Sequence, residues 1–207
     1  MIDTNYHPDW QKNRINFILS KYGKDFFKGK RVLELGAYNG YIGSVLADLG
    51  ADVLCLEGRF QNVLNIQNNY KNVKVELANL DTDVWRWGNW DIIINFGLYY
   101  HLEKYHTEHL ENCLNNCDLM FFESVIYDSS DAELRYGYEI GDDQSLTDNA
   151  GTPSTSFVEN IFKKAGVNYE KFCDSSLNGN GHHYDWIDRN SKQYDAWSRR
   201  MWIVKIK

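Results

Sequence analysis

The stretch Val32-Leu33-Glu34-Leu35-Gly36-Ala37-Tyr38-Asn39-Gly40-Tyr41-Ile42-Gly43 is the most informative part of this chain. An apolar run breaks at a glycine and a helical pattern follows, which predicts a strand, a tight turn and a helix. In an open parallel sheet, such a turn lies at the edge where ligands bind. A dinucleotide fingerprint counted from Gly36 requires glycine at Tyr38 and Tyr41. The turn therefore disfavours a pyrophosphate and remains compatible with a nucleoside that carries no phosphate.

Short apolar runs alternate with longer amphipathic segments along the rest of the chain. This alternation predicts a doubly wound, Rossmann-like α/β sheet whose parallel strands are joined by right-handed crossovers. Predicted strands span 31–35, 52–57, 73–78, 91–96, 119–125, 168–173 and 200–206, and predicted helices span 9–22, 40–49, 60–70, 105–115 and 153–165. No crossover helix follows the last strand. We therefore expect a seven-stranded, mostly parallel sheet with an antiparallel last strand.

Length, charge and composition limit the classes of function. A chain of 207 residues with 43% hydrophobic residues predicts one domain, 1–207. Its net charge of −7 disfavours a nucleic-acid partner, since binding to phosphates rests on Lys and Arg, and favours a small or cationic one. No signal peptide is recognisable, and no stretch approaches the roughly 18 apolar residues of a membrane span. A soluble, cytoplasmic protein with buried free thiols and no metal site is expected.

Acidic and amide side chains follow the second and third predicted strands. Glu57 ends the second strand, where a carboxylate can accept both hydroxyls of an adenosine ribose. Asn79 and Asp81 follow the third strand, where they can bind the exocyclic amine of an adenine or simply shape a turn. The alternative is that Glu57 is a solvated strand end and that the glycines only serve a tight turn.

Three stretches resemble motifs I, II and IV of class I S-adenosylmethionine-dependent methyltransferases. They are Val32 to Gly40, Val53 to Glu57, and Asp91-Ile92-Ile93-Ile94-Asn95-Phe96-Gly97-Leu98-Tyr99-Tyr100-His101-Leu102. The resemblance implies S-adenosylmethionine as the cofactor. It implies that Glu34, Gly36 and Gly40 surround the methionine part, that Glu57 binds the ribose, and that Phe96 or Gly97 borders the transferred methyl. Ala37 and Tyr38 of the same turn, with Asn79 and Asp81, are further expected cofactor contacts.

A narrower likeness concerns the tRNA wobble-uridine carboxymethyl-type transferases. Gly97-Leu98-Tyr99-Tyr100-His101 is similar to their motif after the fourth strand, and His109-Leu110, Phe122-Glu123-Ser124-Val125 and Pro153-Ser154 add further similarities. This chain is much shorter and acidic, so a tRNA substrate is not expected.

Three loops leave the edge of the sheet that holds the cofactor, and we expect them to face the acceptor. They are 97–104 with Tyr99 and Tyr100, 126–152, and 174–198 with Tyr184 and Trp186. The last two are long enough to act as lids. Loop 126–152 is acidic, which suggests a cationic acceptor, although a charge run also suits a solvated face.

His101 is the first candidate for a general base, because its pKa is ordinarily close to neutral and it follows the strand that borders the methyl. A structural anchor for the loop is the alternative. His182 and His183 are the next candidates. As neighbours they point to opposite sides of an extended chain, so a shared metal ion is not expected. The predicted reaction is methyl transfer to a small molecule. The alternatives are an RNA methyltransferase, a non-catalytic S-adenosylmethionine-binding protein and an NAD-dependent enzyme.

Overall fold

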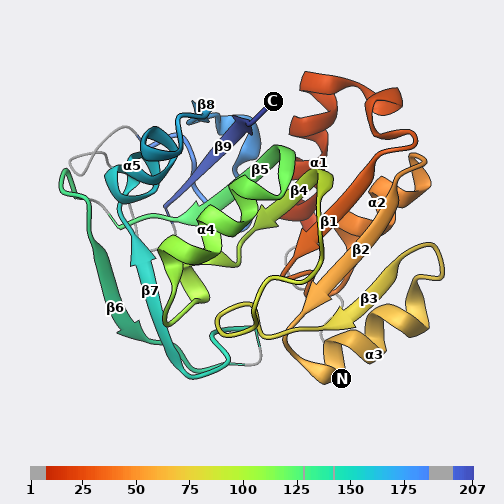
Figure 1. The fold of residues 1–207 in the computed structure, drawn as a ribbon, viewed down its shortest axis with the longest axis horizontal. Helices are drawn as coiled ribbons and strands as arrows, with labels where there is room; N and C mark the ends of the chain where they lie inside the picture. Colours follow the sequence, from red (N-terminus) through yellow and green to blue (C-terminus); the bar gives the residue numbers. More distant parts are fainter. Residues whose placement is uncertain (1–7, 128, 142, 187–197) are drawn as a thin grey trace.

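The computed structural model describes residues 8–127, 129–141, 143–186 and 198–207. At its centre is a seven-stranded sheet in the order β3-β2-β1-β4-β5-β9-β8 (Figure 1). The strands are β1 Arg31–Leu35, β2 Asp52–Glu57, β3 Lys74–Leu77, β4 Trp90–Phe96, β5 Cys117–Val125, β8 Asn168–Phe172 and β9 Arg199–Lys205. Strands β1 to β5 are parallel, and β9 is antiparallel to both of its neighbours. The predicted doubly wound sheet with an antiparallel last strand is confirmed.

Helices cover both faces of the sheet, because its central strands are apolar on both sides. The helices are α1 Pro8–Tyr22, α2 Tyr41–Asp48, α3 Phe60–Asn69, α4 His106–Asn115 and α5 Thr155–Ala165, with short 3₁₀ helices η1 Lys24–Phe27, η2 Tyr99–His101 and η3 Ser175–Leu177. Val32 and Phe121 pack in the layer of α1 and α2. Their neighbours Leu33 and Phe122 pack in the layer of α4 and α5, which lies in front of the sheet in Figure 1.

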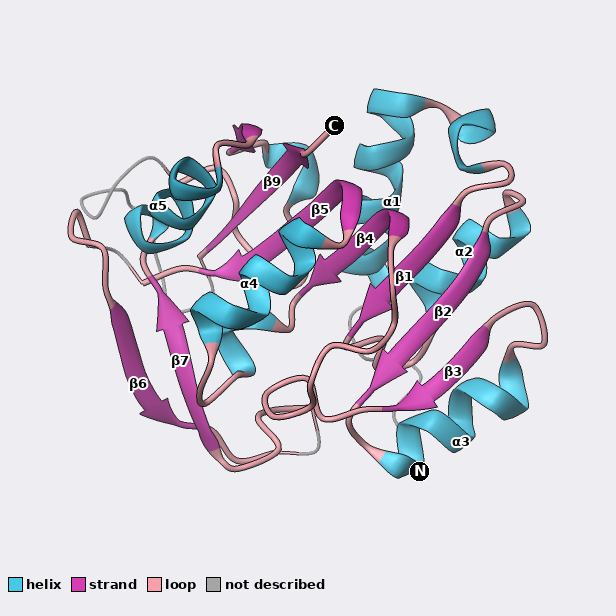
Figure 2. Ribbon diagram, viewed as in Figure 1, coloured by secondary structure: helices cyan, strands magenta, loops and turns pink. Residues whose placement is uncertain are grey.

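Segment 126–152 contains a hairpin that the sequence does not predict. Strand β6, Leu134–Tyr138, pairs antiparallel with β7, Asn149–Pro153 (Figure 2). Strand β7 contains glycine and proline, which are poor strand formers, and β6 is mostly exposed, so neither shows the period of a half-buried strand. The hairpin depends on tertiary packing, since β7 lies against η2.

Pro153 belongs to β7 and not to the helix that it was expected to open. Helix α5 begins two residues later, because Ser154 caps it by accepting a hydrogen bond from the Phe157 amide at 3.1 Å. Gly166, with φ 68°, ends the helix as predicted.

Of the four cysteines, Cys55, Cys113 and Cys117 are buried free thiols, whereas Cys173 is exposed. Within the described ranges, no helix is both long enough and apolar enough to cross a membrane.

Candidate functional site

A cavity opens at the carboxyl ends of β1, β2, β3 and β4, the edge at which a parallel sheet places its ligands. It measures about 1030 Å³, its open mouth included. Helix α1, the turn after β1, the ends of β2 and β4, the loop after β3 and the segment 143–147 all contribute to its wall. Phe96 and Gly97, which were expected to border the transferred methyl, line the cavity where β4 ends.

The turn after β1 is as tight as its glycines indicate. Gly36 (φ 66°) and Gly40 (φ 76°) have left-handed backbone, which other residues rarely adopt. A Cβ on Gly40 would lie 2.9 Å from Ile66 Cγ1, and one on Gly36 would lie 3.1 Å from Leu98 Cβ. Gly36 lines the cavity. Ala37 and Gly40 were also expected to contact the cofactor, but they do not line the cavity and only shape the turn.

Glu57 ends β2 with its carboxylate at the cavity wall. One of its oxygens accepts a hydrogen bond from the Tyr38 amide at 2.7 Å, and the other accepts from the Arg59 amide at 2.9 Å and from Asn62 Nδ2 at 3.2 Å. Burial raises the pKa of this carboxyl, and the three hydrogen bonds oppose the rise. Since a carboxylate offers about four lone-pair sites, one remains for a ligand hydroxyl.

Glu34 lies beneath the start of α2 and does not line the cavity, although it was expected beside the cofactor. Its Oε2 accepts a hydrogen bond from the Gly43 amide at 2.9 Å and lies 3.3 Å from Cys55 Sγ. A Cβ on Gly43 would lie 2.6 Å from the same oxygen, so only glycine permits this approach. Burial raises the pKa of the Glu34 carboxyl to about 7.

The Glu34→Gln variant should gain stability relative to the native chain as the pH rises. Because its pKa is raised in the folded state, the Glu34 carboxyl costs folding stability as the pH rises from about 4.5 to about 7, and the loss levels off above that. The glutamine oxygen can accept from the Gly43 amide without carrying a charge. Urea denaturation should show the difference in unfolding free energy growing by about 2 kcal/mol between about pH 5 and about pH 8. A difference that does not change with pH would contradict the raised pKa.

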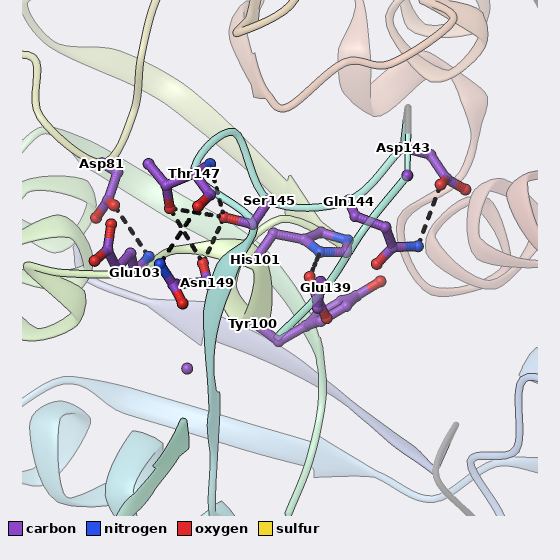
Figure 3. Close-up of polar contacts among 12 residues, drawn as sticks. Asp81, Tyr100, His101, Glu103, Glu139, Asp143, Gln144, Ser145, Thr147 and Asn149 are labelled. Carbon is purple, nitrogen blue, oxygen red and sulfur yellow. Dashed lines mark hydrogen bonds and ion pairs between the residues drawn. The ribbon is translucent and has the colours of Figure 1, made fainter. Parts of the chain in front are cut away.

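Asn79 and Asp81 line the cavity and also shape its loops. Asn79 Oδ1 accepts a hydrogen bond from the Asp81 amide at 3.1 Å. The Asp81 carboxylate accepts from the amides of Glu103 and Lys104 at 3.0 and 2.8 Å, which joins the loop after β3 to the loop after β4 (Figure 3). The turn-forming role left open by the sequence is therefore present, together with a place in the cavity wall.

The loop after β4 sends its two tyrosines to different places. Tyr99 is fully buried and its hydroxyl donates to His106 O at 3.0 Å, so this expected substrate contact lies away from the cavity. Tyr100 lines the cavity, and its hydroxyl accepts a hydrogen bond from Arg199 Nη2 at 2.9 Å.

His101 lines the cavity and is paired with Glu139 (Figure 3). His101 Nδ1 lies 2.6 Å from Glu139 Oε2, which leaves Nε2 as the second ring nitrogen for a ligand. Glu139 follows β6, and its amide donates to Asp148 O at 2.8 Å. Sequence reasoning missed Glu139, because its place beside His101 depends on the unpredicted hairpin.

The two histidines of segment 174–198 also differ in their position relative to the cavity. His182 lines the cavity, and its ring lies 5.5 Å from that of Trp10 on α1. His183 does not line it; its carbonyl accepts a hydrogen bond from the Arg199 amide at 2.8 Å. Of the two, only His182 is placed to meet a ligand.

Tyr184 and Trp186 lie in the interior and not along the cavity where substrate contacts were expected. The Tyr184 hydroxyl donates to Glu123 Oε1 at 3.0 Å, and Trp186 Nε1 donates to Arg199 O at 3.1 Å. Both rings pack this segment onto β5 and β9. The remainder of the expected substrate loop, 187–197, lies outside the described residues.

Three charged residues that were not predicted as site residues form a buried cluster beside Gly97. Arg14 lies 2.7 Å from Glu123, and Glu123 lies 3.0 Å from Arg199. Both arginines line the cavity. A signal was present in the sequence: Glu123 interrupts an apolar strand, and Arg14 stands at helical spacing between two buried residues of α1.

The segment 143–147 forms part of the cavity wall, and the side chain of Arg59 holds it there by binding backbone carbonyls. Arg59 Nη2 donates to the carbonyls of Gly141, Gln144 and Ser145 at 3.1, 3.0 and 3.1 Å. Figure 3 shows Gln144 and Ser145 near His101. The contacts hold this part of loop 126–152 beside the ends of β2 and β4.

The acidic residues of loop 126–152 do not gather round the cavity. Among those described, Asp143 alone lines it. The exposed side chains include Asp131, Glu133, Tyr136, Tyr138 and Asp148. Asp128 and Asp142 lie outside the described residues. The described part of this loop therefore lends little support to the expected cationic acceptor.

No protein-family model matches this chain, and no curated protein matches it in sequence. Solved structures do match in fold. The N-terminal domain of EvdMO1, in the presence of SAH and D-fucose, is 19% identical with a TM-score of 0.68, and the match covers 97% of this chain and 83% of that one.

Two further structures share the fold. Magnesium protoporphyrin IX methyltransferase (ChlM) from Synechocystis PCC 6803 with bound SAM is 11% identical with a TM-score of 0.60, covering 95% of this chain and 79% of that one. Coclaurine N-methyltransferase bound to N-methylheliamine and SAH is 18% identical with a TM-score of 0.58, covering 80% of this chain and 52% of that one. At these identities, what the chains share is the fold.

Proposed function

We propose that this chain, which has the class I methyltransferase fold, transfers a methyl group from S-adenosylmethionine to a small-molecule acceptor. The observation that carries the proposal is a single cavity that extends from Glu57 at the end of β2 to His101 beyond β4. It places a carboxylate suited to a ribose and a histidine suited to proton transfer in one enclosure.

The nucleoside end of the cavity would hold the adenosine part of the cofactor. Glu57 has one acceptor site left for a ribose hydroxyl, and Asn79 and Asp81 flank the place for the adenine. Gly36 and Tyr38 border the methionine part. Similar structures that contain SAH or SAM support this choice of cofactor.

When bound, S-adenosylmethionine supplies an electrophilic methyl group on a sulfonium. Phe96 and Gly97 would border that methyl and exclude water from it. His101 Nε2 would accept the proton that a hydroxyl or amine nucleophile loses as its new bond to carbon forms. Glu139 would hold the ring through Nδ1 and stabilise the imidazolium that results.

A small acceptor fits the cavity better than RNA does. The segment 143–147 and His182 line the cavity together with the strand ends, and the net charge of −7 disfavours binding to a phosphate backbone. A non-catalytic binding protein would need no histidine and carboxylate pair at the acceptor end.

Calorimetry should show that the purified protein binds S-adenosylmethionine and SAH at least about tenfold more tightly than NAD, because the turn after β1 has no pyrophosphate cradle. Methyl incorporation from labelled cofactor should then be measured across small alcohols, amines and hydroxy acids, with bulk RNA as the comparison. NAD binding as tight as that of SAH would overturn the cofactor assignment. Labelling of RNA alone would overturn the small-molecule acceptor.

A further inference from the structure

Two arginines and one glutamate are buried together beside Gly97. The side chains of Arg14 and Glu123 are 0% exposed, and that of Arg199 is 3% exposed. Glu123 Oε2 lies 2.7 Å from Arg14 Nη2, and Glu123 Oε1 lies 3.0 Å from Arg199 Nη1. Since one carboxylate faces two guanidiniums, the cluster holds one positive charge that no described residue neutralises.

Two tyrosines complete the cluster without adding a negative charge. The Tyr184 hydroxyl accepts from Arg14 Nε and donates to Glu123 Oε1, both at 3.0 Å. The Tyr100 hydroxyl accepts from Arg199 Nη2 at 2.9 Å. Burial raises the pKa of both phenols above their ordinary value of 10.0, so both are neutral at physiological pH. The excess positive charge therefore persists.

Some hydrogen-bond donors of this cluster have no acceptor among the described residues. Arg14 Nη1 and Arg199 Nε have no hydrogen-bond partner among the described residues. The Tyr100 hydroxyl, which accepts from Arg199, has no described acceptor for its own proton. Arg14, Arg199 and Tyr100 all line the cavity, and Arg14 Nη1 would lie 3.4 Å from a Cβ on Gly97. An unpaired buried donor and an uncompensated buried charge both cost folding free energy, and a bound anion offsets that cost.

We infer that Arg14, Arg199 and Tyr100 bind a carboxylate carried by the methyl acceptor. A guanidinium presents paired donors that match a carboxylate, and one carboxylate neutralises the one excess charge. The inference rests on the proposed function, which puts the nucleoside beside Glu57. Glu123 on β5 and Arg199 on β9 lie across β4 from β1 and β2, so the cluster is on the side of the cavity that the proposed function gives to the acceptor.

The acceptor is accordingly an acid that also bears a separate hydroxyl or amine. Its carboxylate occupies the arginine cluster, and its nucleophile turns toward the methyl and His101. This charge preference is the opposite of the one that the acidic loop 126–152 suggests, because the arginines line the cavity whereas most described acidic side chains of that loop do not.

The probes for the test are benzoate and 4-hydroxybenzoate, each compared with its neutral amide. Binding to SAH-saturated protein at neutral pH is measured by calorimetry or ligand-observed NMR. Each carboxylate should bind about tenfold or more tightly than its amide, since a hydrogen bond to a charged group is the stronger kind. Equal binding of acid and amide, or no binding of either, would overturn the inference, and the binding of SAH would still support the proposed function.

Three variants locate the carboxylate. Arg14→Lys keeps the charge beside Glu123 but loses the free Nη1, and should weaken benzoate binding about tenfold. Tyr100→Phe keeps the ring, removes one donor and should weaken benzoate binding about fivefold. Arg200→Lys is the matched control, because Arg200 is also buried on β9 but donates to the carbonyls of Tyr184 and Trp186. It should leave benzoate binding within about twofold of the native value.

The same variants separate two sources of the carboxylate, the acceptor and the methionine part of the cofactor. If the cluster serves the acceptor, Arg14→Lys and Tyr100→Phe should leave SAH affinity within about threefold of the native value. A loss of SAH affinity with unchanged benzoate binding would show that the cluster binds the carboxylate of the cofactor, and would overturn the inference. Should Arg14→Lys fail to fold, Tyr100→Phe decides alone, since it leaves every charge in place.

Discussion

Replacement of His101 by asparagine should lower the methyl-transfer turnover number by about 100-fold and leave SAH affinity nearly unchanged. In the proposed mechanism the imidazole takes the proton of the nucleophile, and the amide of asparagine is not basic. Glu139→Gln should lower turnover by about tenfold, because the glutamine would still contact the ring but would not stabilise its charged form.

Turnover is measured with the acceptor found in the labelling panel, under saturating cofactor. Lys104→Gln is the control, since Lys104 belongs to the same loop and its side chain is 62% exposed. It should retain turnover within about twofold. If His101→Asn loses folding stability in step with its activity, the histidine is a structural anchor for the loop. Full activity of the variant would remove His101 from the mechanism.

Glu57→Ala should weaken the binding of SAH by about 5- to 150-fold, the range expected for a lost hydrogen bond to a charged group. The variant loses the proposed acceptor for the ribose and also the oxygen that holds the Tyr38 amide in the turn after β1. Calorimetry with SAH measures the loss. The SAH affinity of Glu57→Gln should fall between those of the native chain and Glu57→Ala, because its single amide oxygen can accept from only some of the present donors.

Asp52→Asn is the matched control for Glu57, because Asp52 stands at the opposite end of β2 and forms an exposed pair with Lys74. It should bind SAH as the native chain does, since exposed ion pairs contribute little. Native affinity in Glu57→Ala would move the ribose contact elsewhere. A melting temperature that falls without ligand would show that Glu57 also supports the turn.

The turn after β1 and the position of Glu57 could be anticipated because they depend on local sequence. The turn needs glycine at positive φ, and Glu57 needs only to end the neighbouring strand. Glu34 shows the limit of that reasoning. It stands in the same motif, yet its side chain turns beneath α2, because the absence of a Cβ on Gly43 opens a space there.

The residues at the proposed acceptor end of the cavity could not be predicted from local sequence in this way. Tyr99 and Tyr100 are neighbours in the chain, but one fills the interior and the other lines the cavity. Tyr184 was expected to contact the substrate because it lies in a long loop. Its burial against Glu123 follows from the packing of that loop onto β5, which no local pattern records.

The sequence alone was sufficient for the succession of the α-helices and of the seven strands of the main sheet, for the antiparallel last strand and for the glycine turn, since each follows from periodicity or from the conformation of one residue type. The side-chain pairings between residues far apart in the chain became visible only in the folded structure. It placed Glu139 on His101 through a hairpin without strand periodicity, and it joined Arg14, Glu123 and Arg199 from three distant elements. A buried charge is tolerated where other groups satisfy it, and those groups are brought together by packing rather than by nearness in the chain.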